Sequence, residues 1–411
     1  MKHNFPAHRT GGVRHDRGVA STYSSSGVIG RSGRMPVVDP DLLRSSRADL
    51  DGSPLPLVGT ARIYTCGITP YDVTHLGHAA TFVWADLLAT ALHAAGVASM
   101  VCRNVTDVDD VLTAAASGRG RPYDEFALTQ EFLFDRDMRA LRVAEPGNVP
   151  HARSHVKHVV QLAGALLRTG HAYERDGYVF FRGEQAVRAS GLDEAEAERL
   201  ATEFGDRAEE DGRAAPFDVP VWRPSPEDHP AWPSPWGWGR PGWHAECAAM
   251  AWAVCGSSID VLVGGQDLAF PHHAYQAAMV EAASGVTPFA RCQMHVGAVR
   301  HRGAKMAKST QNLVLVSDLL AEHPGAAIRL MLLNRRWQQP WEYDAEQPAA
   351  SRALLDRLYE AAARPSDAAT GKAGVLGALL DDLDVPTAVA RALEEQGATA
   401  RALLDLLKLT P

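Results

Sequence analysis

The amino-acid sequence predicts an α/β protein whose parallel sheet is split by a helical insertion and followed by a helical bundle. Two buried strands, Ile63 to Cys66 and Ala98 to Val105, flank a segment with helical periodicity from His75 to about Ala95. The order strand, helix, strand is typical of a parallel sheet, in which ligands bind at the carboxyl ends of the strands. A further strand, Ile259 to Val263, ends in Gly264-Gly265 and leads into a helix at Pro271, which predicts the second half of the sheet.

The residues between the two halves predict an inserted domain. Residues 110–200 have a largely helical pattern with a hairpin around Tyr173 to Arg182, and Pro216 to Pro241 is predicted as a loop because of its proline and glycine content. After Lys308, leucines at helical spacing predict helices to the end. We expect a flexible N-terminal tail, the first half of the sheet domain, an inserted connective domain, the second half, a signature-loop region and a helical bundle, at residues 1–50, 51–115, 116–235, 236–300, 301–345 and 346–411.

Composition excludes several classes of protein. The chain of 411 residues has a formal net charge of −8, which argues against a broad basic face for nucleic-acid phosphates. Its five cysteines include no CxxC pair, which indicates a reducing compartment. We find no apolar run of about 18 residues and no signal-peptide core in residues 1–34, so we expect a cytoplasmic protein without a membrane partner. Met35 is an alternative start, and we expect a monomer, although no sequence feature determines the oligomeric state.

Two separate elements indicate chemistry on phosphates. His75 and His78 flank Gly77 where a strand gives way to a helix, and a helix N-terminus favours phosphate. Lys305 and Lys308 lie in a short segment much later in the chain, and their ammonium groups suit a leaving pyrophosphate. Each element alone is compatible with a capped helix or a solvated loop. Together they resemble the HIGH and KMSKS signatures of class I aminoacyl-tRNA synthetases.

Four stretches make the resemblance more specific. They resemble the family of cysteinyl-tRNA synthetases and their shortened homologue, the ligase that joins cysteine to glucosaminyl-inositol in mycothiol biosynthesis. The likeness covers roughly residues 55–345 and implies a class I synthetase-like Rossmann catalytic domain split by a helical insertion, with a C-terminal helical bundle. The stretches are Cys66 to Ala79, Arg103 to Asp110, Pro241 to Cys247, and Gly264 to His273.

The resemblance implies a zinc site formed by Cys66, Cys247 and His272, with an open fourth position for the thiolate of substrate cysteine. Two thiolates and an imidazole suit zinc, and three protein ligands with an open position are typical of a catalytic site. The alternative is three core residues that never meet. His244-Ala245-Glu246 also resembles the HxE motif of a nucleobase deaminase, but the PCxxC partner is missing.

The resemblance also assigns the remaining site residues. It assigns catalysis to His75, His78, Lys305 and Lys308. It assigns binding of the cysteinyl part of the substrate to Thr69, Trp243 and Asp267, with Asp267 pairing the ammonium group. Binding of the AMP part is assigned to Thr81, Asn104, Thr106, Gly265 and the backbone at Val299. The binding set is completed by the neighbouring residues Cys66, Gly67, Ile68, Val105 and Gln266.

The choice between synthetase and ligase rests on two further features. Only 102 residues follow Ser309, fewer than the anticodon-binding region of a cysteinyl-tRNA synthetase needs. Gln276 stands where the synthetase has a glutamate as fourth zinc ligand. We therefore expect a ligase that uses L-cysteine, ATP with Mg²⁺ and glucosaminyl-inositol, contains one Zn²⁺ per chain and binds no tRNA.

Three departures from the ligase pattern leave the acceptor amine open. Ala307 replaces the first serine of the KMSKS signature, residues 203–208 match an ERGGDP motif only loosely, and Thr310-Gln311-Asn312 stands where RGN is usual. The alternatives are a cysteine ligase for another amine, a truncated cysteinyl-tRNA synthetase, and a catalytically silent regulator that binds cysteine or adenylate.

Overall fold

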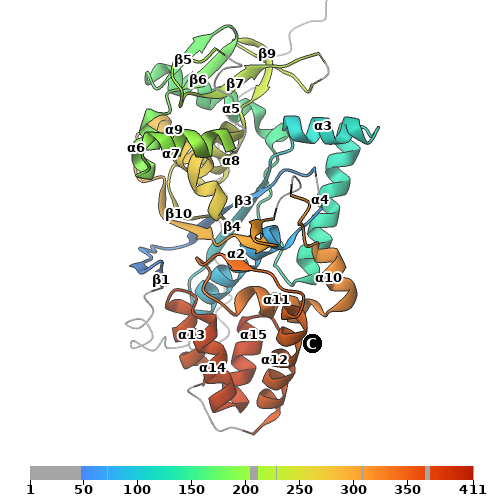
Figure 1. Cartoon of the computed structure of the whole chain (residues 1–411). Helices are drawn as coiled ribbons and strands as arrows, with labels where there is room; N and C mark the ends of the chain where they lie inside the picture. The colour runs from blue at the N-terminus through green and yellow to red at the C-terminus, as the bar shows by residue number, and fades with distance from the viewer. Residues whose placement is uncertain are drawn as a thin grey trace, which may run out of the picture. The chain divides into compact units, whose positions relative to one another are not determined.

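A parallel sheet forms the centre of the protein (Figure 1). The computed structural model describes residues 48–71, 73–203, 212–227, 229–306, 310–365 and 371–410, all of which belong to one compact unit. The sheet has the order β11-β10-β3-β4, with every neighbouring pair parallel. Its strands are β3 (Ala61–Ile68), β4 (Ser99–Val105), β10 (Ile259–Gly265) and β11 (Ala290–Val296). The predicted parallel sheet is confirmed, although β11 was not predicted.

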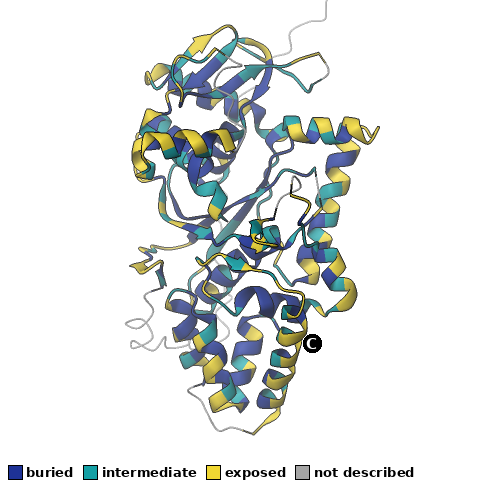
Figure 2. Cartoon of the chain, in the orientation of Figure 1, coloured by how far each residue is buried: buried dark blue, intermediate teal, exposed yellow. Residues whose placement is uncertain are grey.

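Helices cover both faces of this sheet, and the strands are buried accordingly (Figure 2). Ile63 and Val261 pack into one core with α2 (Leu76–Ala94), whereas Tyr64 and Leu262 pack into a second core with α8 (Trp243–Cys255). This separation follows from the alternation of side chains along a strand. On the second face, α9 (Ala274–Ser284) follows β10 through the short turns η1 (Gln266–Leu268) and η2 (Ala269–His273).

The insertion between β4 and α8 contains helices and an antiparallel sheet. The helices are α3 (Asp110–Gly118), α4 (Tyr123–Ala140), α5 (Ala152–Arg168), α6 (Glu184–Ser190) and α7 (Glu194–Glu203). The sheet has the order β5-β6-β7-β9-β8 and contains the predicted hairpin. Its strands are β5 (Ala172–Arg175), β6 (Tyr178–Phe181), β7 (Val219–Pro224), β8 (Trp232–Ser234) and β9 (Gly237–Pro241).

The predicted loop from Pro216 to Pro241 is wrong, because three of these strands fall within it. The sheet tolerates proline where no ladder hydrogen bond is lost. Pro233 lies on the edge strand β8, Pro224 and Pro241 end their strands, and Pro220 adjoins a register shift between β6 and β7. A high content of proline and glycine alone therefore does not distinguish a loop from strands in which the prolines occupy tolerated positions.

Helices dominate the chain after the second half of the sheet. They are α10 (Val316–Glu322), α11 (Gly325–Leu333), α12 (Gln347–Ala363), α13 (Gly371–Leu380), α14 (Val385–Glu395) and α15 (Gly397–Leu406). The predicted C-terminal helices are thus confirmed. A small sheet was not predicted. Its strands β12 (Val299–His301) and β13 (Ala304–Lys305) precede α10, and β14 (Trp341–Glu342) lies between α11 and α12. Near the start, β1 (Asp49–Leu50), at the end of the range predicted as a tail, pairs with β2 (Ser53–Pro54), which lies just beyond that range.

A buried ion cluster joins α2 to the helices that follow. Asp86 accepts hydrogen bonds from the Arg329 guanidinium at 2.6 Å, from Lys408 Nζ at 2.6 Å and from the Ala144 N–H at 2.8 Å. Arg329 is fully buried and also donates to the Leu141 and Leu407 carbonyls. Burial of a guanidinium is costly unless its donors are all used. The cluster therefore fixes α2 against α11 and the last turn of the described chain.

Among the described residues, no helix is both long enough and apolar enough to cross a membrane. The boundaries between the six predicted segments remain predictions. Residues 1–47, most of the 203–208 segment, and Ala307, Lys308 and Ser309 of the signature loop lie outside the described residues.

Candidate functional site

The amino end of α2 presents two stacked histidine rings. His75 is the N-cap residue, and its Nδ1 accepts a hydrogen bond of 3.1 Å from the Gly77 N–H. The His75 and His78 ring centroids lie 3.8 Å apart. A side chain at position 77 would place its Cβ 2.9 Å from the His75 ring, so glycine is required for this fold-back. The predicted position of both histidines on the first turn is confirmed.

Both histidines are uncharged at neutral pH. Burial lowers the pKa of His75 to about 2, with His78 and Lys305 adding to the effect. Burial lowers the pKa of His78 to about 4, although the Asp267 carboxylate acts in the opposite direction. At this site the rings are hydrogen-bonding groups, and positive charge comes from lysine and from the helix N-terminus.

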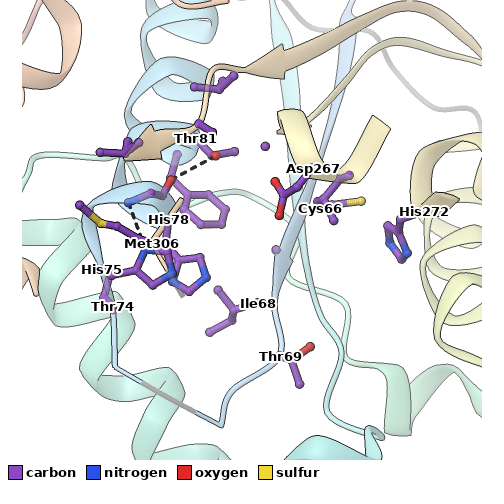
Figure 3. Close-up of a pocket in the computed structure, with 18 of the residues that line it drawn as sticks. Cys66, Ile68, Thr69, Thr74, His75, His78, Thr81, Asp267, His272 and Met306 are labelled. Atoms are coloured by element: carbon purple, nitrogen blue, oxygen red, sulfur yellow. Dashed lines mark hydrogen bonds between the residues drawn. The ribbon is translucent and has the colours of Figure 1, made fainter. Parts of the chain in front are cut away.

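These histidines open onto a cavity of about 380 Å³ that runs to the far side of β3 (Figure 3). Figure 3 shows His75, His78 and Met306 at one side of this cavity, Cys66 and His272 at the other, and Asp267 between them. Most predicted site residues line it: Cys66, Gly67, Ile68, Thr69, His75, His78, Thr81, Asn104, Thr106, Trp243, Cys247, Gly265, Asp267, His272, Val299 and Lys305.

Two predicted residues do not line this cavity. Val105 is fully buried, and its N–H donates to the Pro150 carbonyl, which points to a structural role. Gln266 faces a neighbouring cavity of about 480 Å³ whose wall also includes Asp267. Lys308 lies outside the described residues.

Sequence reasoning missed several residues of the cavity wall. Phe82 lies one turn after His78 on α2, so the helical period could have identified it. Phe134 comes from the inserted helix α4 and packs edge-to-face on Phe82 with ring centroids 5.0 Å apart. No local pattern links these two segments. Other unpredicted wall residues include Tyr71, Thr74, Met306 and Leu313.

One end of the cavity contains a cluster that could hold a metal ion. Cys66 comes from β3, Cys247 from α8 and His272 from η2, and one ligand atom from each lies within 4.8 Å of the others. All three residues are buried. The alternative that these residues never meet is therefore wrong. Two sulfurs and one imidazole nitrogen form a soft donor set, which fits zinc better than it fits magnesium or calcium.

The electrostatics of the cluster also fit a cation. Burial lowers the pKa of His272 well below its usual value, which leaves the imidazole neutral with a free lone pair. Burial and the neighbouring Cys66 raise the pKa of the Cys247 thiol. A buried thiolate pair is therefore stable only next to a compensating positive charge, which a metal ion supplies.

Polar side chains surround the cluster. The Cys66 thiol lies 3.4 Å from Gln276 Oε1, the Asn104 amide donates to Cys247 Sγ at 3.1 Å, and His244 Nδ1 lies 2.9 Å from His272 Nδ1. Asn104 Oδ1 also accepts from the Gly67 N–H at 2.7 Å. The amide of Asn104 is thus engaged at both ends next to the cluster, and its predicted contact with AMP remains a prediction.

An ion pair links Asp267, in the middle of the cavity, to Lys305, the first lysine of the segment that resembles the KMSKS signature. Lys305 Nζ donates to Asp267 Oδ2 at 2.8 Å, and the two side chains are 44% and 35% exposed. Lys305 lies on β13, two residues before the undescribed residues 307–309. The carboxylate predicted to bind the substrate ammonium is thus paired with one of the predicted catalytic lysines.

Comparison with solved structures defines the fold. Methionyl-tRNA synthetase of Mycobacterium tuberculosis bound by methionyl-adenylate superimposes with a TM-score of 0.59, over 85% of this chain and 88% of that chain at 14% identity. The leucyl-tRNA synthetase of Agrobacterium radiobacter K84 in its ternary complex gives a TM-score of 0.58, over 90% and 85% of the two chains at 13% identity. The fold is therefore that of a class I aminoacyl-tRNA synthetase.

Sequence comparison identifies the family within this class. The model described as "tRNA synthetases class I (C) catalytic domain" matches residues 57–352, and the chain belongs to this family. The L-cysteine:1D-myo-inositol 2-amino-2-deoxy-alpha-D-glucopyranoside ligase of Parafrankia sp. is 42% identical over 85% of this chain and 80% of its own length. The ligase of the same name from Streptosporangium roseum is 40% identical over 80% and 83%. Cysteine--tRNA ligase of Rhodospirillum rubrum is 39% identical over 84% and 76%. The predicted family resemblance is confirmed.

Proposed function

We propose that this protein is an ATP-dependent ligase of mycothiol biosynthesis that activates L-cysteine and joins it to the amine of 1-O-(2-amino-2-deoxy-α-D-glucopyranosyl)-myo-inositol. The observation that carries the proposal is the similarity to ligases of that printed name, at 40–42% identity over at least 80% of each chain for the two named above. The cluster of Cys66, Cys247 and His272 in the same cavity supports a thiol substrate.

Substrate cysteine would bind with its side chain towards this cluster. A zinc ion there would supply an open coordination position that binds a thiolate, which discriminates against serine more strongly than a shaped pocket does. Trp243 would close the pocket, since its ring lies 4.2 Å from the ring of His272. Asp267 would bind the substrate ammonium group, which therefore competes with Lys305 for the same carboxylate.

The opposite end of the cavity would hold the triphosphate of Mg-bound ATP. The cysteine carboxylate attacks the α-phosphate in line, a P–O bond forms, and pyrophosphate leaves with the electrons of the broken P–O bond. His75 and His78 would donate hydrogen bonds as neutral rings, while the N-terminus of α2, Lys305 and Lys308 would stabilise negative charge.

In the second step, the sugar amine would attack the carbonyl carbon of cysteinyl-AMP. A C–N bond forms, AMP leaves with the electrons of the C–O bond, and the proton of the amine passes to solvent or to the leaving phosphate. Because the acceptor is neutral apart from its amine, it needs a pocket beside the adenylate and no extended basic surface.

The test is pyrophosphate exchange dependent on cysteine, followed by product analysis with glucosaminyl-inositol or tRNA. We expect exchange with cysteine and not with serine, and formation of cysteinyl-glucosaminyl-inositol. Adenylation with neither acceptor used would indicate a ligase for another amine. No exchange at all would indicate the silent regulator and contradict the proposal.

A truncated cysteinyl-tRNA synthetase is the second candidate, because a cysteine--tRNA ligase matches nearly as well as the sugar ligases do. Charge argues against it, since residues 351–411 contain seven basic and nine acidic side chains. Binding of RNA requires neutralised phosphates and becomes weaker as salt rises. Robust, salt-sensitive charging of tRNA with cysteine would favour the synthetase.

A further inference from the structure

Each residue of the metal-binding cluster is contacted by at least one uncharged polar side chain. We propose that Gln276, Asn104 and His244, here called the outer partners, determine how tightly the cluster binds its metal and keep one coordination position suited to a third sulfur. This inference rests on the proposed metal site. The contacts are Gln276 to Cys66, Asn104 to Cys247, and His244 to His272.

His244 fixes the orientation of the His272 ring. His272 Nε2 lies 3.1 Å from Cys247 Sγ and therefore faces the cluster, while His272 Nδ1 lies 2.9 Å from His244 Nδ1. An imidazole that binds metal through Nε2 carries its proton on Nδ1, so His272 donates this hydrogen bond and His244 accepts it. The His244 ring stacks on Tyr275, with centroids 5.2 Å apart and planes inclined by 12°. The Tyr275 hydroxyl donates to the Phe217 carbonyl, so the acceptor is rigidly held.

Asn104 is oriented by the backbone next to the other ligand. Its Oδ1 accepts from the Gly67 N–H, which directs its Nδ2 towards Cys247 Sγ. This approach requires glycine, because a Cβ at position 67 would lie 1.7 Å from the Asn104 carbonyl oxygen. The N–H to sulfur contact therefore follows from the close pairing of β3 and β4, and an amide flip would break both bonds.

Gln276 is the outer partner of Cys66. The side chain is fully buried, and its Nε2 has no hydrogen-bond partner among the described residues. A metal-bound thiolate accepts hydrogen bonds and donates none. A half-turn of the amide would bring Nε2 to Cys66 Sγ and remove the unpaired donor, whose burial otherwise costs free energy.

The neutrality of the outer partners suits the proposed substrate. Two thiolates balance the charge of Zn²⁺, so a third thiolate leaves an excess negative charge in a buried site. The Asn104 N–H points at Cys247 Sγ, and once the Gln276 amide has turned its N–H would point at Cys66 Sγ, so both groups would offset this charge without adding a competing anion. We therefore expect the outer partners to favour a site that accepts a third sulfur.

The test measures zinc affinity by chelator competition on the full chain without nucleotide. We expect Asn104→Leu, Gln276→Met and His244→Leu each to weaken zinc binding by about 10- to 100-fold. His244→Asn should restore most of the loss, because its Oδ1 can accept from His272. The control His93→Ala changes an exposed histidine in the last turn of α2 and should bind zinc as wild type does.

The cobalt-substituted protein gives an independent readout. Its sulfur-to-cobalt absorption band should shift in Asn104→Leu and Gln276→Met, which alter N–H contacts to sulfur, and remain in place in His244→Asn. If Asn104→Leu does not fold, Asn104→Asp removes the same donor at constant shape.

Wild-type zinc affinity together with unshifted bands in the Asn104 and Gln276 variants would overturn the inference and leave the proposed function intact. Failure of the wild-type protein to bind zinc would instead contradict the metal site of the proposed function.

Discussion

The two ends of the candidate active-site cavity differ in how their side chains are held. At the sulfur end, Cys66, Cys247 and His272 are buried, and each contacts a fixed uncharged side chain. At the phosphate end, Lys305 is 44% exposed, and its main described contact is the partly exposed carboxylate of Asp267. The side chains at the sulfur end are held in place without substrate. At the phosphate end, Lys305 has to leave Asp267 in order to contact a phosphate.

This difference matches the demands of the two substrates. A thiol is small and needs a ligand geometry accurate to a few tenths of an ångström, which a rigid buried set supplies. A triphosphate changes its charge distribution during reaction and needs mobile cations in the transition state. Substitutions at the sulfur end should therefore affect binding, and substitutions at the phosphate end should affect rate.

The largest effect is expected for Cys247→Ser at the sulfur end. The variant should lose most of its zinc, measured as metal content per chain, because serine is a poor ligand for a soft cation. We expect cysteine-dependent pyrophosphate exchange to fall by roughly three orders of magnitude. Cys292→Ser is the control, since this half-buried cysteine on β11 lies outside the cluster. Full zinc occupancy in Cys247→Ser would contradict the ligand assignment.

At the phosphate end, Lys308→Ala should slow adenylate formation by about two to three orders of magnitude, because the lysine acts mainly in the transition state. The affinity for cysteine, measured by equilibrium binding, should barely change. Lys157→Ala on α5 provides a control outside the cavity. An unaltered exchange rate in Lys308→Ala would remove the basis for treating this loop as a catalytic signature.

Asp267→Asn tests the exchange of partners between the two ends. Loss of the carboxylate should weaken cysteine binding by about tenfold, a modest figure because the side chain is 35% exposed. ATP binding measured without cysteine should not weaken, because Lys305 is freed from its ion pair. A variant in which ATP affinity falls and cysteine affinity is unchanged would mean that Asp267 serves the nucleotide.

The smallest effect concerns pH and the histidine pair. The pKa of His78 is about 4 in the folded protein and near 6.5 in an unfolded chain, so the unfolded state binds the proton first as pH falls. The stability contributed by the neutral ring is therefore complete above about pH 6.5 and is lost between about pH 6.5 and 4. His78→Asn should lose less stability than wild type between pH 7 and 5, by on the order of 1 to 2 kcal/mol in urea unfolding. Equal losses would contradict the assigned pKa of His78.

The parts of the fold that could be predicted from sequence are those with local patterns. β3, β4, β10 and α2 have continuous apolar runs or helical periodicity, and the structure confirms them. β11 was missed because Arg291 and Gln293 interrupt its apolar pattern, as expected for an edge strand of the sheet. The three strands β7, β8 and β9 that extend the predicted hairpin were missed because their prolines were treated as breakers.

The ligand set of the site was predicted from motifs, but its surroundings could not be. Cys66, Cys247 and His272 were named from separate segments, and the structure brings them together. The sequence contains no local signal that Asn104 would contact Cys247, a residue 143 positions away. The edge-to-face contact between Phe82 and Phe134 in the cavity wall depends in the same way on tertiary packing between α2 and the inserted helix α4.

The ion cluster around Asp86 also determines when during synthesis on the ribosome helix α2 can pack. Asp86 is made early, but its partners Arg329 and Lys408 follow 243 and 322 residues later. At roughly 5 to 20 residues per second, the interval before Lys408 is about 15 to 65 s. Until Arg329 has been made, the Asp86 carboxylate on α2 has neither cation, and burying it alone would be unfavourable. Helix α2 can therefore reach the packing seen in the structure only after Arg329 and Lys408 have been made.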